Sequence, residues 1–241
     1  MRTEADPQPL SADRHRVEAA LAVAAEVGPF FAQHRDASAV PLSPEQLYEP
    51  RRLNSVLDAI GHQLGTREGR VAAFTLQYGV AARCWSLILG AWQCGRVIID
   101  MRGLGFVVAA PGTVELTLTD VRAWDSASLT ADEVAELIAD TVTGHVLADL
   151  HTALRTVLRV ADGLLWGNAA SALVSATRTL YARQPSEELT AVTTAILSRA
   201  PLADRLVRTS GGSVLRRSCC LWYRTRHRDN CGDCPLSAAR Q

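Results

Sequence analysis

Residues 71–92 have the sequence VAAFTLQYGVAARCWSLILGAW. When this stretch is wound into an α-helix, apolar side chains fall on nearly every face, and Gly79 and Gly90 are the weakest helix formers within it. A helix that is apolar all round is buried in the core of a protein. We therefore predict a buried central helix over residues 71–92, around which the rest of the chain packs. Cys84 and Cys94, within this helix and at its end, are expected to be core thiols.

Cap signals on both sides of the central helix predict further helices. Four polar residues precede apolar positions at helical spacing, and two of them are followed three residues later by the Gln or Glu of a capping box. Residues 168–181 are rich in Ala, Ser and Leu, which suits close packing between helices. The predicted caps are Ser11, Ser43 (with Gln46), Thr130 (with Glu133) and Ser186, whose helix ends near Arg199.

Between these helices the hydrophobic period changes from helical to alternating. Residues 97–99 and 106–110 are short β-branched or apolar runs, and apolar residues alternate with polar ones over 114–118. A Pro-Gly pair between the last two runs favours a hairpin turn. The predicted fold class is therefore α+β, mostly α-helical, with a small antiparallel sheet at about residues 96–119.

The composition excludes several classes of protein. The chain has 241 residues with 25 basic and 25 acidic side chains, and every basic residue is arginine. The absence of lysine excludes Schiff-base chemistry and a P-loop lysine, and the zero net charge argues against a nucleic-acid coat.

The N-terminus lacks the apolar region of a signal peptide, and no apolar stretch is long enough to span a bilayer. We therefore expect a cytoplasmic protein whose thiols are reduced.

Cysteine is unevenly distributed, because four of the six cysteines lie in the last 23 residues. They form the pattern C-C-x10-C-x2-C and are Cys219, Cys220, Cys231 and Cys234. The C-x2-C half is typical of a knuckle that presents two thiolates to one metal. The adjacent pair departs from the spacing usual for structural zinc, whereas a [2Fe–2S] cluster accepts a less uniform ligand geometry. The residues thus favour a metal centre and leave zinc and iron–sulfur as alternatives.

The same end of the chain is rich in positive charge. Residues 199–241 hold nine arginines and three aspartates. A [2Fe–2S] cluster with four thiolates carries a charge of about −2, and about −3 after reduction, so nearby positive charge favours the reduced form. The two aromatic residues of the segment are expected to shield the centre from solvent. Candidates for the cluster environment, or for docking of a donor or substrate, are Arg216, Arg217, Trp222, Tyr223, Arg224 and His227.

The cysteine pattern is accompanied by Arg216-Arg217-Ser218 on its N-terminal side and by Pro235 after the last cysteine. Together these residues closely resemble the C-terminal signature of the FhuF-type ferric-siderophore reductases. The resemblance covers roughly residues 211–236. It implies that the four cysteines ligate a [2Fe–2S] cluster and that no catalytic residue is needed beyond the cluster itself.

The resemblance also implies a function and a division of the chain. A cytoplasmic protein of this type takes one electron from a cellular donor, a ferredoxin or a flavoprotein reductase, and passes it to Fe(III) held by an imported siderophore. Hard oxygen donors bind Fe(II) far less tightly, so reduction releases the iron. We expect residues 1–210 to form the mostly helical siderophore-binding domain and residues 211–241 the [2Fe–2S] segment, with Gly211 and Gly212 as a hinge. No nucleic-acid partner and no membrane span are expected.

An alternative from another class is a structural zinc knuckle, or an iron–sulfur redox sensor, whose basic tail binds nucleic acid or a protein.

The stretch 103–105 lacks the third glycine of a nicotinamide-binding fingerprint, so direct oxidation of NADPH is not expected. His145 and His151 are six residues apart and cannot share a helix face, which makes them weak metal candidates. Trp166, Asn168 and Arg178 could face a ligand, but the helix around them is more simply interpreted as packed core.

Overall fold

The computed structural model describes residues 10–36, 38–209 and 214–238. Over these residues the chain is mostly α-helical with small two-stranded antiparallel ladders, which confirms the predicted fold class. The α-helices are α1 (Arg14–Ala25), α2 (Pro44–Tyr48), α3 (Pro50–Leu64), α4 (Gly69–Gly95), α5 (Ala131–Ala139), α6 (Ala148–Val157), α7 (Asp162–Arg183), α8 (Glu187–Ser198) and α9 (Pro235–Ala238). The strands are β1 (Val97–Ile99), β2 (Leu104–Ala110), β3 (Thr113–Leu118), β4 (Ala123–Asp125), β5 (Leu206–Arg208) and β6 (Val214–Arg216). The shorter 3-10 segments are Pro29–Phe31, Met101–Gly103 and Trp222–Arg224, and Asp140–Leu147 is a π-helical segment between α5 and α6.

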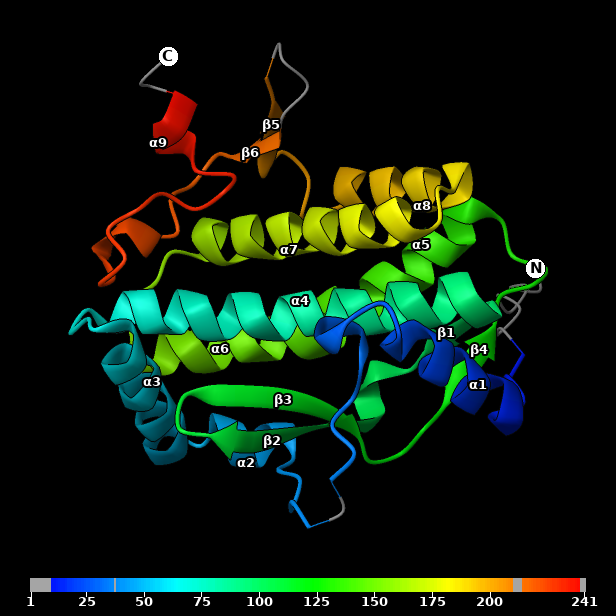
Figure 1. Cartoon of the computed structure of the whole chain (residues 1–241), viewed down its shortest axis with the longest axis horizontal. Helices are drawn as coiled ribbons and strands as arrows, with labels where there is room; N and C mark the ends of the chain where they lie inside the picture. The colour runs from blue at the N-terminus through cyan, green and yellow to red at the C-terminus, as the bar shows by residue number, and fades with distance from the viewer. Residues whose placement is uncertain (1–9, 37, 210–213, 239–241) are drawn as a thin grey trace, which may run out of the picture.

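Helix α4 is the centre of the molecule, as the apolar run predicted. It extends across the whole body, with α7 on one side, α6 on the other, and α1 and α3 packed near its two ends (Figure 1). The indole Nε1 of Trp85 donates a hydrogen bond to the carbonyl oxygen of Ala169 at 3.0 Å, which joins α4 to α7 inside the core. Cys84 is buried, as expected, but Cys94 is exposed. The expectation for Cys94 was wrong because the last turn of α4 turns this side chain to the surface.

The cap predictions are confirmed at three positions and wrong at one. Ser43 and Thr130 form complete capping boxes, and Ser186 caps α8 through the backbone N–H of Leu189. Helix α1, however, begins after Asp13, whose carboxylate accepts the N–H of residue 16, instead of after Ser11. A carboxylate is an equally good cap, and the residues before it lie in extended backbone that pairs with β4.

The predicted sheet consists of separate ladders. Strands β2 and β3 form the expected hairpin, whose turn contains Gly112 at a φ of 76°, a conformation that favours glycine. Strand β1 does not join this hairpin and pairs instead with β4, a strand that was not predicted. The β1 and β4 strands are each only three residues long, so no alternating pattern could reveal β4.

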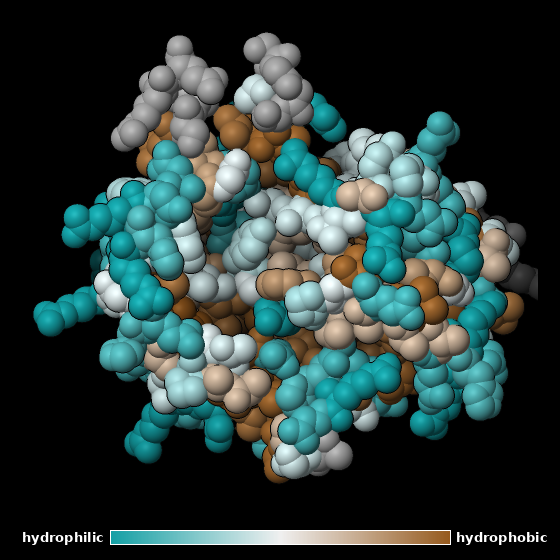
Figure 2. Space-filling view, viewed as in Figure 1, coloured by the Kyte–Doolittle hydropathy of each residue, from teal (hydrophilic) through white to brown (hydrophobic). Residues whose placement is uncertain are grey.

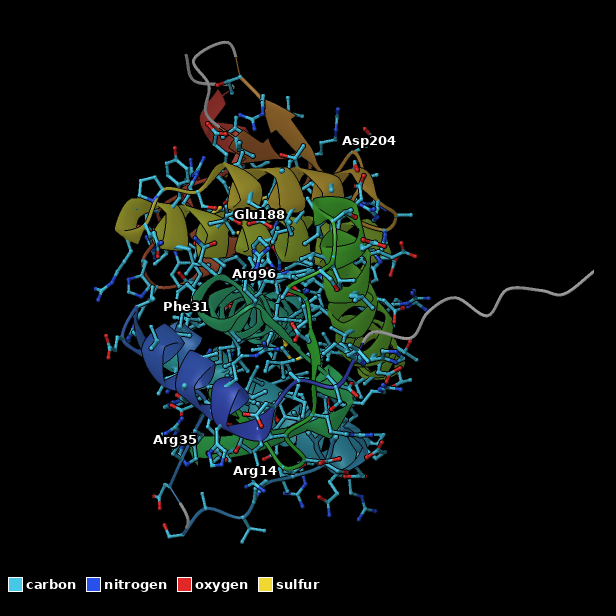
Figure 3. All side chains as sticks on the ribbon, turned by 90° about the vertical axis from the view of Figure 1, so that its right-hand side faces the viewer. Arg14, Phe31, Arg35, Arg96, Glu188 and Asp204 are labelled. Atoms are coloured by element: carbon cyan, nitrogen blue, oxygen red, sulfur yellow. The ribbon has the colours of Figure 1, made fainter. Side chains whose placement is uncertain are left out.

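The helical region after Thr130 closes the other side of the core. His151 of α6 is buried and lies 3.0 Å from Gln77 of α4, while His145 of the π-helical segment is exposed, so the two histidines do not form a joint site. Arg96, which caps the C-terminal end of α4, makes a two-pronged ion pair with Glu188 at the start of α8, at 2.8 Å for both contacts (Figure 3). This pair fixes α8 against the end of the central helix.

The C-terminal segment folds back over the body after α8 and lies above α7 and the α3 end of α4 (Figure 1). Its hairpin of β5 and β6 connects the two predicted parts of the chain, and the boundary at residue 210 stays a prediction. The predicted hinge at Gly211 and Gly212 lies outside the described residues. Within the described residues, none of the helices combines the length and the apolar character that crossing a membrane requires.

Candidate metal centre

Contacts from three helices hold the cysteine segment on the body. The cysteine segment approaches α7 closely at Gly167, where an added Cβ atom would lie 2.5 Å from the hydroxyl oxygen of Ser218 and would displace that hydroxyl group. The backbone N–H of Arg226 donates to the carbonyl oxygen of Leu64 at the end of α3, at 2.9 Å. The Arg224 guanidinium binds both carboxylate oxygens of Glu68, just before α4, at 2.9 and 2.8 Å. The segment is therefore positioned by the helical body.

The four predicted ligands are free thiols on this segment, and the structure brings two of them together. The sulfur atoms of Cys220 and Cys231 are 3.3 Å apart. Cys234 is buried, and its backbone N–H donates to the carbonyl oxygen of Cys231 at 3.2 Å, as expected of a C-x2-C turn. The sulfur of Cys219 accepts the N–H of Leu221 at 3.4 Å. Among the described residues, no three His, Cys, Asp or Glu side chains already converge on one point as metal ligands.

The groups around Cys220 and Cys231 favour a thiolate at this pair of cysteines. The hydrogen bond between the two sulfurs and the neighbouring guanidinium of Arg216 lower the pKa of Cys220 to about 6. The hydrogen bond to Cys220 and burial raise the pKa of Cys231. One of the two thiols is therefore deprotonated near neutral pH, and deprotonation of the other requires a nearby cation or a metal.

Arg216 is the charged residue most closely associated with the cysteines. Its side chain is 3% exposed, and its Nη2 atom lies 2.7 Å from the sulfur of Cys231 and 2.9 Å from a carboxylate oxygen of Asp233. Its Nη1 atom donates to the amide oxygen of Asn168 on α7. Burial alone would lower the pKa of this guanidinium, but the negative charges of Cys220 and Asp233 raise it overall. The sequence named Arg216 as one of several candidates, and burial distinguishes it from the others.

The side chains of most of the other predicted environment residues contact one another or the helical body. The ring of Trp222 stacks on that of His227, with 5.6 Å between centroids, and its Nε1 donates to Asp229. His227 is thus engaged by an aromatic ring, while Tyr223 contacts the guanidinium of Arg224 through its hydroxyl group. Arg217, next to the buried Arg216, is exposed.

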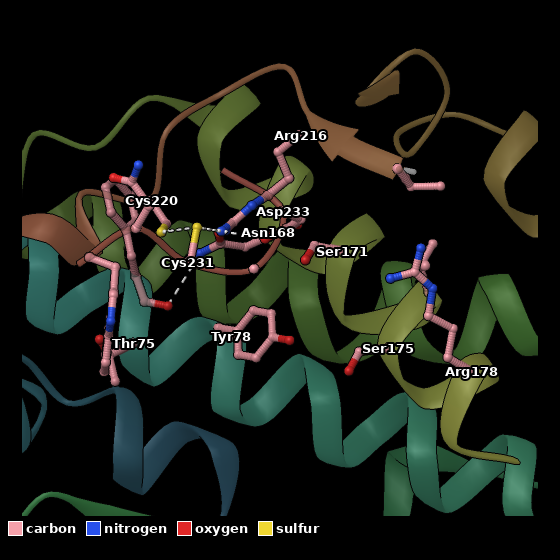
Figure 4. Close-up of a pocket in the computed structure, with 16 residues that line it drawn as sticks. Thr75, Tyr78, Asn168, Ser171, Ser175, Arg178, Arg216, Cys220, Cys231 and Asp233 are labelled. Atoms are coloured by element: carbon pink, nitrogen blue, oxygen red, sulfur yellow. Dashed lines mark hydrogen bonds and ion pairs between the residues drawn. The ribbon is translucent and has the colours of Figure 1, made fainter. Parts of the chain in front are cut away.

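A cavity of about 580 Å³ lies between the cysteine segment and the helical body (Figure 4). On the same face, the space-filling surface is hollowed between this segment and the helices beneath it (Figure 2). One wall carries Cys220, Cys231 and Trp222, and the opposite wall comes from α4 and α7. The wall from α7 contains Asn168 and Arg178, so the packed-core interpretation of this helix was wrong for its cavity-facing side. The remaining lining residues are Phe74, Thr75, Tyr78, Ser171, Val174, Ser175, Val214, Arg216, Asn230, Gly232 and Asp233.

Sequence reasoning missed the serines and the tyrosine of this wall. A usable signal was present, because Asn168, Ser171, Ser175 and Arg178 follow the three-four-three spacing of one helix face. The many alanines between these positions obscured the polar stripe. No signal within the cysteine segment could have indicated that its Asp233 pairs with Arg216.

The residues present fit a cluster held by thiolates. Two thiolates on one tetrahedral metal, with metal–sulfur bonds of about 2.3 Å, lie about 3.8 Å apart. The observed separation of 3.3 Å between the sulfurs of Cys220 and Cys231 is close to this value. Arg216 donates toward the sulfur of Cys231, and the backbone N–H of Leu221 donates to the sulfur of Cys219, which is the kind of hydrogen bonding that stabilises anionic clusters.

Comparison with known families agrees with this geometry. Residues 216–236 match the family model of the FhuF 2Fe-2S C-terminal domain. The match confirms the resemblance and identifies the cofactor of this segment as a [2Fe–2S] cluster, in preference to zinc. The assignment of the four cysteines as its ligands stays a prediction. No curated protein matches the chain.

Proposed function

We propose that this chain is a ferric-siderophore reductase that passes one electron to Fe(III) in an imported chelate and so releases Fe(II) in the cytoplasm. One observation carries the proposal: the segment that matches the FhuF 2Fe-2S domain places Cys220 and Cys231 on the wall of a cavity that the helical body completes. A chelate in this cavity would lie directly beside the cysteines. Association of the family with siderophore-iron reduction supports the same reaction.

In this proposal Cys219, Cys220, Cys231 and Cys234 hold the cluster, which supplies a one-electron carrier when bound. The sulfurs of Cys220 and Cys231 are already neighbours, so these two residues would need the least movement to hold the cluster. The reaction moves an electron and breaks no covalent bond, so it requires no acid, base or nucleophile from the protein. The chain's own residues orient the chelate, keep water from the sulfurs and set the local charge.

The protein side of the reaction is electrostatic. Arg216 is buried beside the thiolates and stays charged, so it stabilises the extra negative charge of the reduced state. Trp222 lines the cavity next to Cys220 and would limit access of water from that side. The oxygen donors of a siderophore bind Fe(II) more weakly than Fe(III), so the reduced iron leaves the chelate.

A ferredoxin or a flavoprotein reductase would supply the electron. The outer surface of the segment carries exposed arginines, among them Arg217, Arg226 and Arg228. Such a surface attracts a donor whose docking face is acidic and raises the rate of encounter.

The experiment that tests the function uses protein purified without oxygen. Visible absorption that bleaches with dithionite is expected, and the reduced protein should transfer its electron to a ferric hydroxamate in a single turnover. Replacing Cys231→Ser should abolish both the colour and the transfer. Cys94→Ser, an exposed thiol outside the segment, is the matched control and should leave both unchanged.

Two results would contradict the proposal. Colourless protein with stoichiometric zinc would assign the segment to a structural knuckle. A coloured protein that bleaches with dithionite but transfers no electron to any ferric chelate would assign it to redox sensing.

A further inference from the structure

Helix α7 carries a polar stripe along the face that lines the cavity. Asn168, Ser171, Ser175 and Arg178 occupy successive positions on this face, and all four line the cavity. Asn168 lies at the cysteine end, where it contacts Arg216, and Arg178 lies at the opposite end (Figure 4). Asn168 and Ser171 are buried polar residues on this face, whereas Ser175 and Arg178 are exposed toward the opening of the cavity.

The hydroxyl groups of this wall are free to bind a ligand. Tyr78 of α4 points into the cavity between the cysteines and Arg178 (Figure 4). Among the described residues, the side chains of Tyr78, Ser171 and Ser175 have no hydrogen-bond partner. Three unpaired hydroxyls beside a tryptophan and a phenylalanine form a wall with both polar and apolar contacts, as ligand pockets require.

The charge of the lining differs between its two ends, because thiolates lie at the cysteine end and a guanidinium at the other. Asp233, the carboxylate of the lining, is paired with Arg216. Arg178 is exposed, and within the described part of the chain it has neither an ion-pair nor a hydrogen-bond partner. Among the described lining residues, Arg178 is therefore the cation without an anionic partner, and it lies at the far end from the cysteines. A guanidinium binds carboxylates in a two-pronged geometry.

We infer that this cavity is the chelate-binding site and that it selects ferric chelates bearing a carboxylate away from the iron, which Arg178 binds while the iron faces Cys220 and Cys231. The inference rests on the proposed function and adds the class of its substrate. The volume of about 580 Å³ lies within the range of roughly 300–1,000 Å³ that holds a ligand of drug size. It also far exceeds the space that a [2Fe–2S] cluster alone would occupy.

The test measures binding without electron transfer. Gallium(III) forms chelates of the same shape as iron(III) but is not reduced, so calorimetry with the cluster-loaded protein gives an affinity independent of turnover. The probes are gallium complexes of one linear trihydroxamate whose terminal amine is free, acetylated or succinylated, which makes them cationic, neutral and anionic. We expect the anionic complex to bind about tenfold more tightly than the cationic one.

Substitutions at the far end of the cavity should change this order. Arg178→Gln should make the three affinities similar, and Arg178→Glu should reverse their order. The matched control is Arg183→Gln, an exposed arginine on the same helix that does not line the cavity, and the original order should persist there. Equal affinities in the unaltered protein, or an unchanged order in Arg178→Glu, would overturn the inference.

A second pair of variants tests the cavity itself. Ser175→Trp should fill it and weaken binding of all three complexes by at least about tenfold, while the visible spectrum of the cluster is retained. Thr179→Trp adds the same bulk to α7 outside the cavity and should leave binding unchanged. Full binding in Ser175→Trp would place the chelate elsewhere.

These results separate the inference from the function on which it rests. If the protein transfers an electron to the ferric forms of all three chelates with no charge preference, the inferred preference for the anionic chelate is refuted. The proposed reductase function is then retained. Absence of both gallium-chelate binding and electron transfer would refute the reductase.

Discussion

Replacing Arg216→Gln would remove the buried positive charge beside Cys231 while keeping a side chain that can donate hydrogen bonds. The reduced cluster carries one more negative charge than the oxidised cluster, so a nearby cation stabilises the reduced form selectively. Loss of this cation should therefore lower the reduction potential and make the protein harder to reduce. The conservative Arg216→Lys variant keeps the charge and should keep most of the potential.

The size of this change follows from the contact. The guanidinium Nη2 lies 2.7 Å from the sulfur of Cys231, and a metal–sulfur bond of about 2.3 Å places it within about 5 Å of a metal held by that sulfur. At an effective dielectric constant of about 20, two unit charges at this distance interact by about 3 kcal/mol. For a one-electron couple this energy corresponds to about 140 mV. The opposing charge of Asp233 reduces the effect, and we expect a decrease of roughly 100 mV.

The assay is a redox titration of the anaerobic protein followed by visible absorption and by the spin resonance of the reduced state. Arg217→Gln is the matched control, because the neighbouring guanidinium is exposed and screened by water, and its potential should hardly change. Because Arg216 is buried, its loss also leaves Asp233 unpaired and should destabilise the protein without its cluster. An Arg216→Gln protein that retains its cluster and the potential of the unaltered protein would refute the electrostatic argument.

Further predictions concern the contacts that hold the segment, the donor and the core. Gly167→Ala should displace the Ser218 hydroxyl group, weaken the contact of the cysteine segment with α7 and modestly speed loss of the cluster to a chelator. Gly79→Ala meets only ordinary contacts and should not; equal rates of loss would contradict this. Rates of reduction by an acidic ferredoxin should fall with ionic strength, and Arg228→Glu should lower both the rate and its salt dependence; a rate independent of salt would exclude electrostatic docking. Burial lowers the pKa of His151 to about 4. As the pH falls below about 6.5, the imidazole is protonated in the unfolded chain before it is protonated in the folded protein. The free energy of unfolding should therefore decrease by about 3 kcal/mol between pH 6.5 and 4. His151→Gln should flatten that loss in denaturant titrations, and an equally steep loss in the variant would assign it to other groups.

The sequence alone predicted the features that depend on residues close together in the chain. The apolar run 71–92 could only be a buried helix, and the capping boxes at Ser43 and Thr130 satisfy backbone groups within three residues. The hairpin needed only two short runs and a Pro-Gly turn. The cysteine pattern is equally local: it indicated a metal centre, and its resemblance to the FhuF signature implied the [2Fe–2S] cluster that the family match confirmed.

Only the tertiary structure decided which distant residues meet. Arg216 and Asn168 are 48 residues apart in the chain, and nothing in either local pattern specifies their contact. The cavity exists because the C-terminal segment is held over α7, where Gly167 permits close approach, and this placement turns a stripe of small polar residues into the wall of a site. Packing also turned Cys94 outward and paired β1 with β4. Local patterns record the hydrogen bonds and apolar faces of single elements, whereas burial of a charge and the shape of a cavity are properties of elements that pack together.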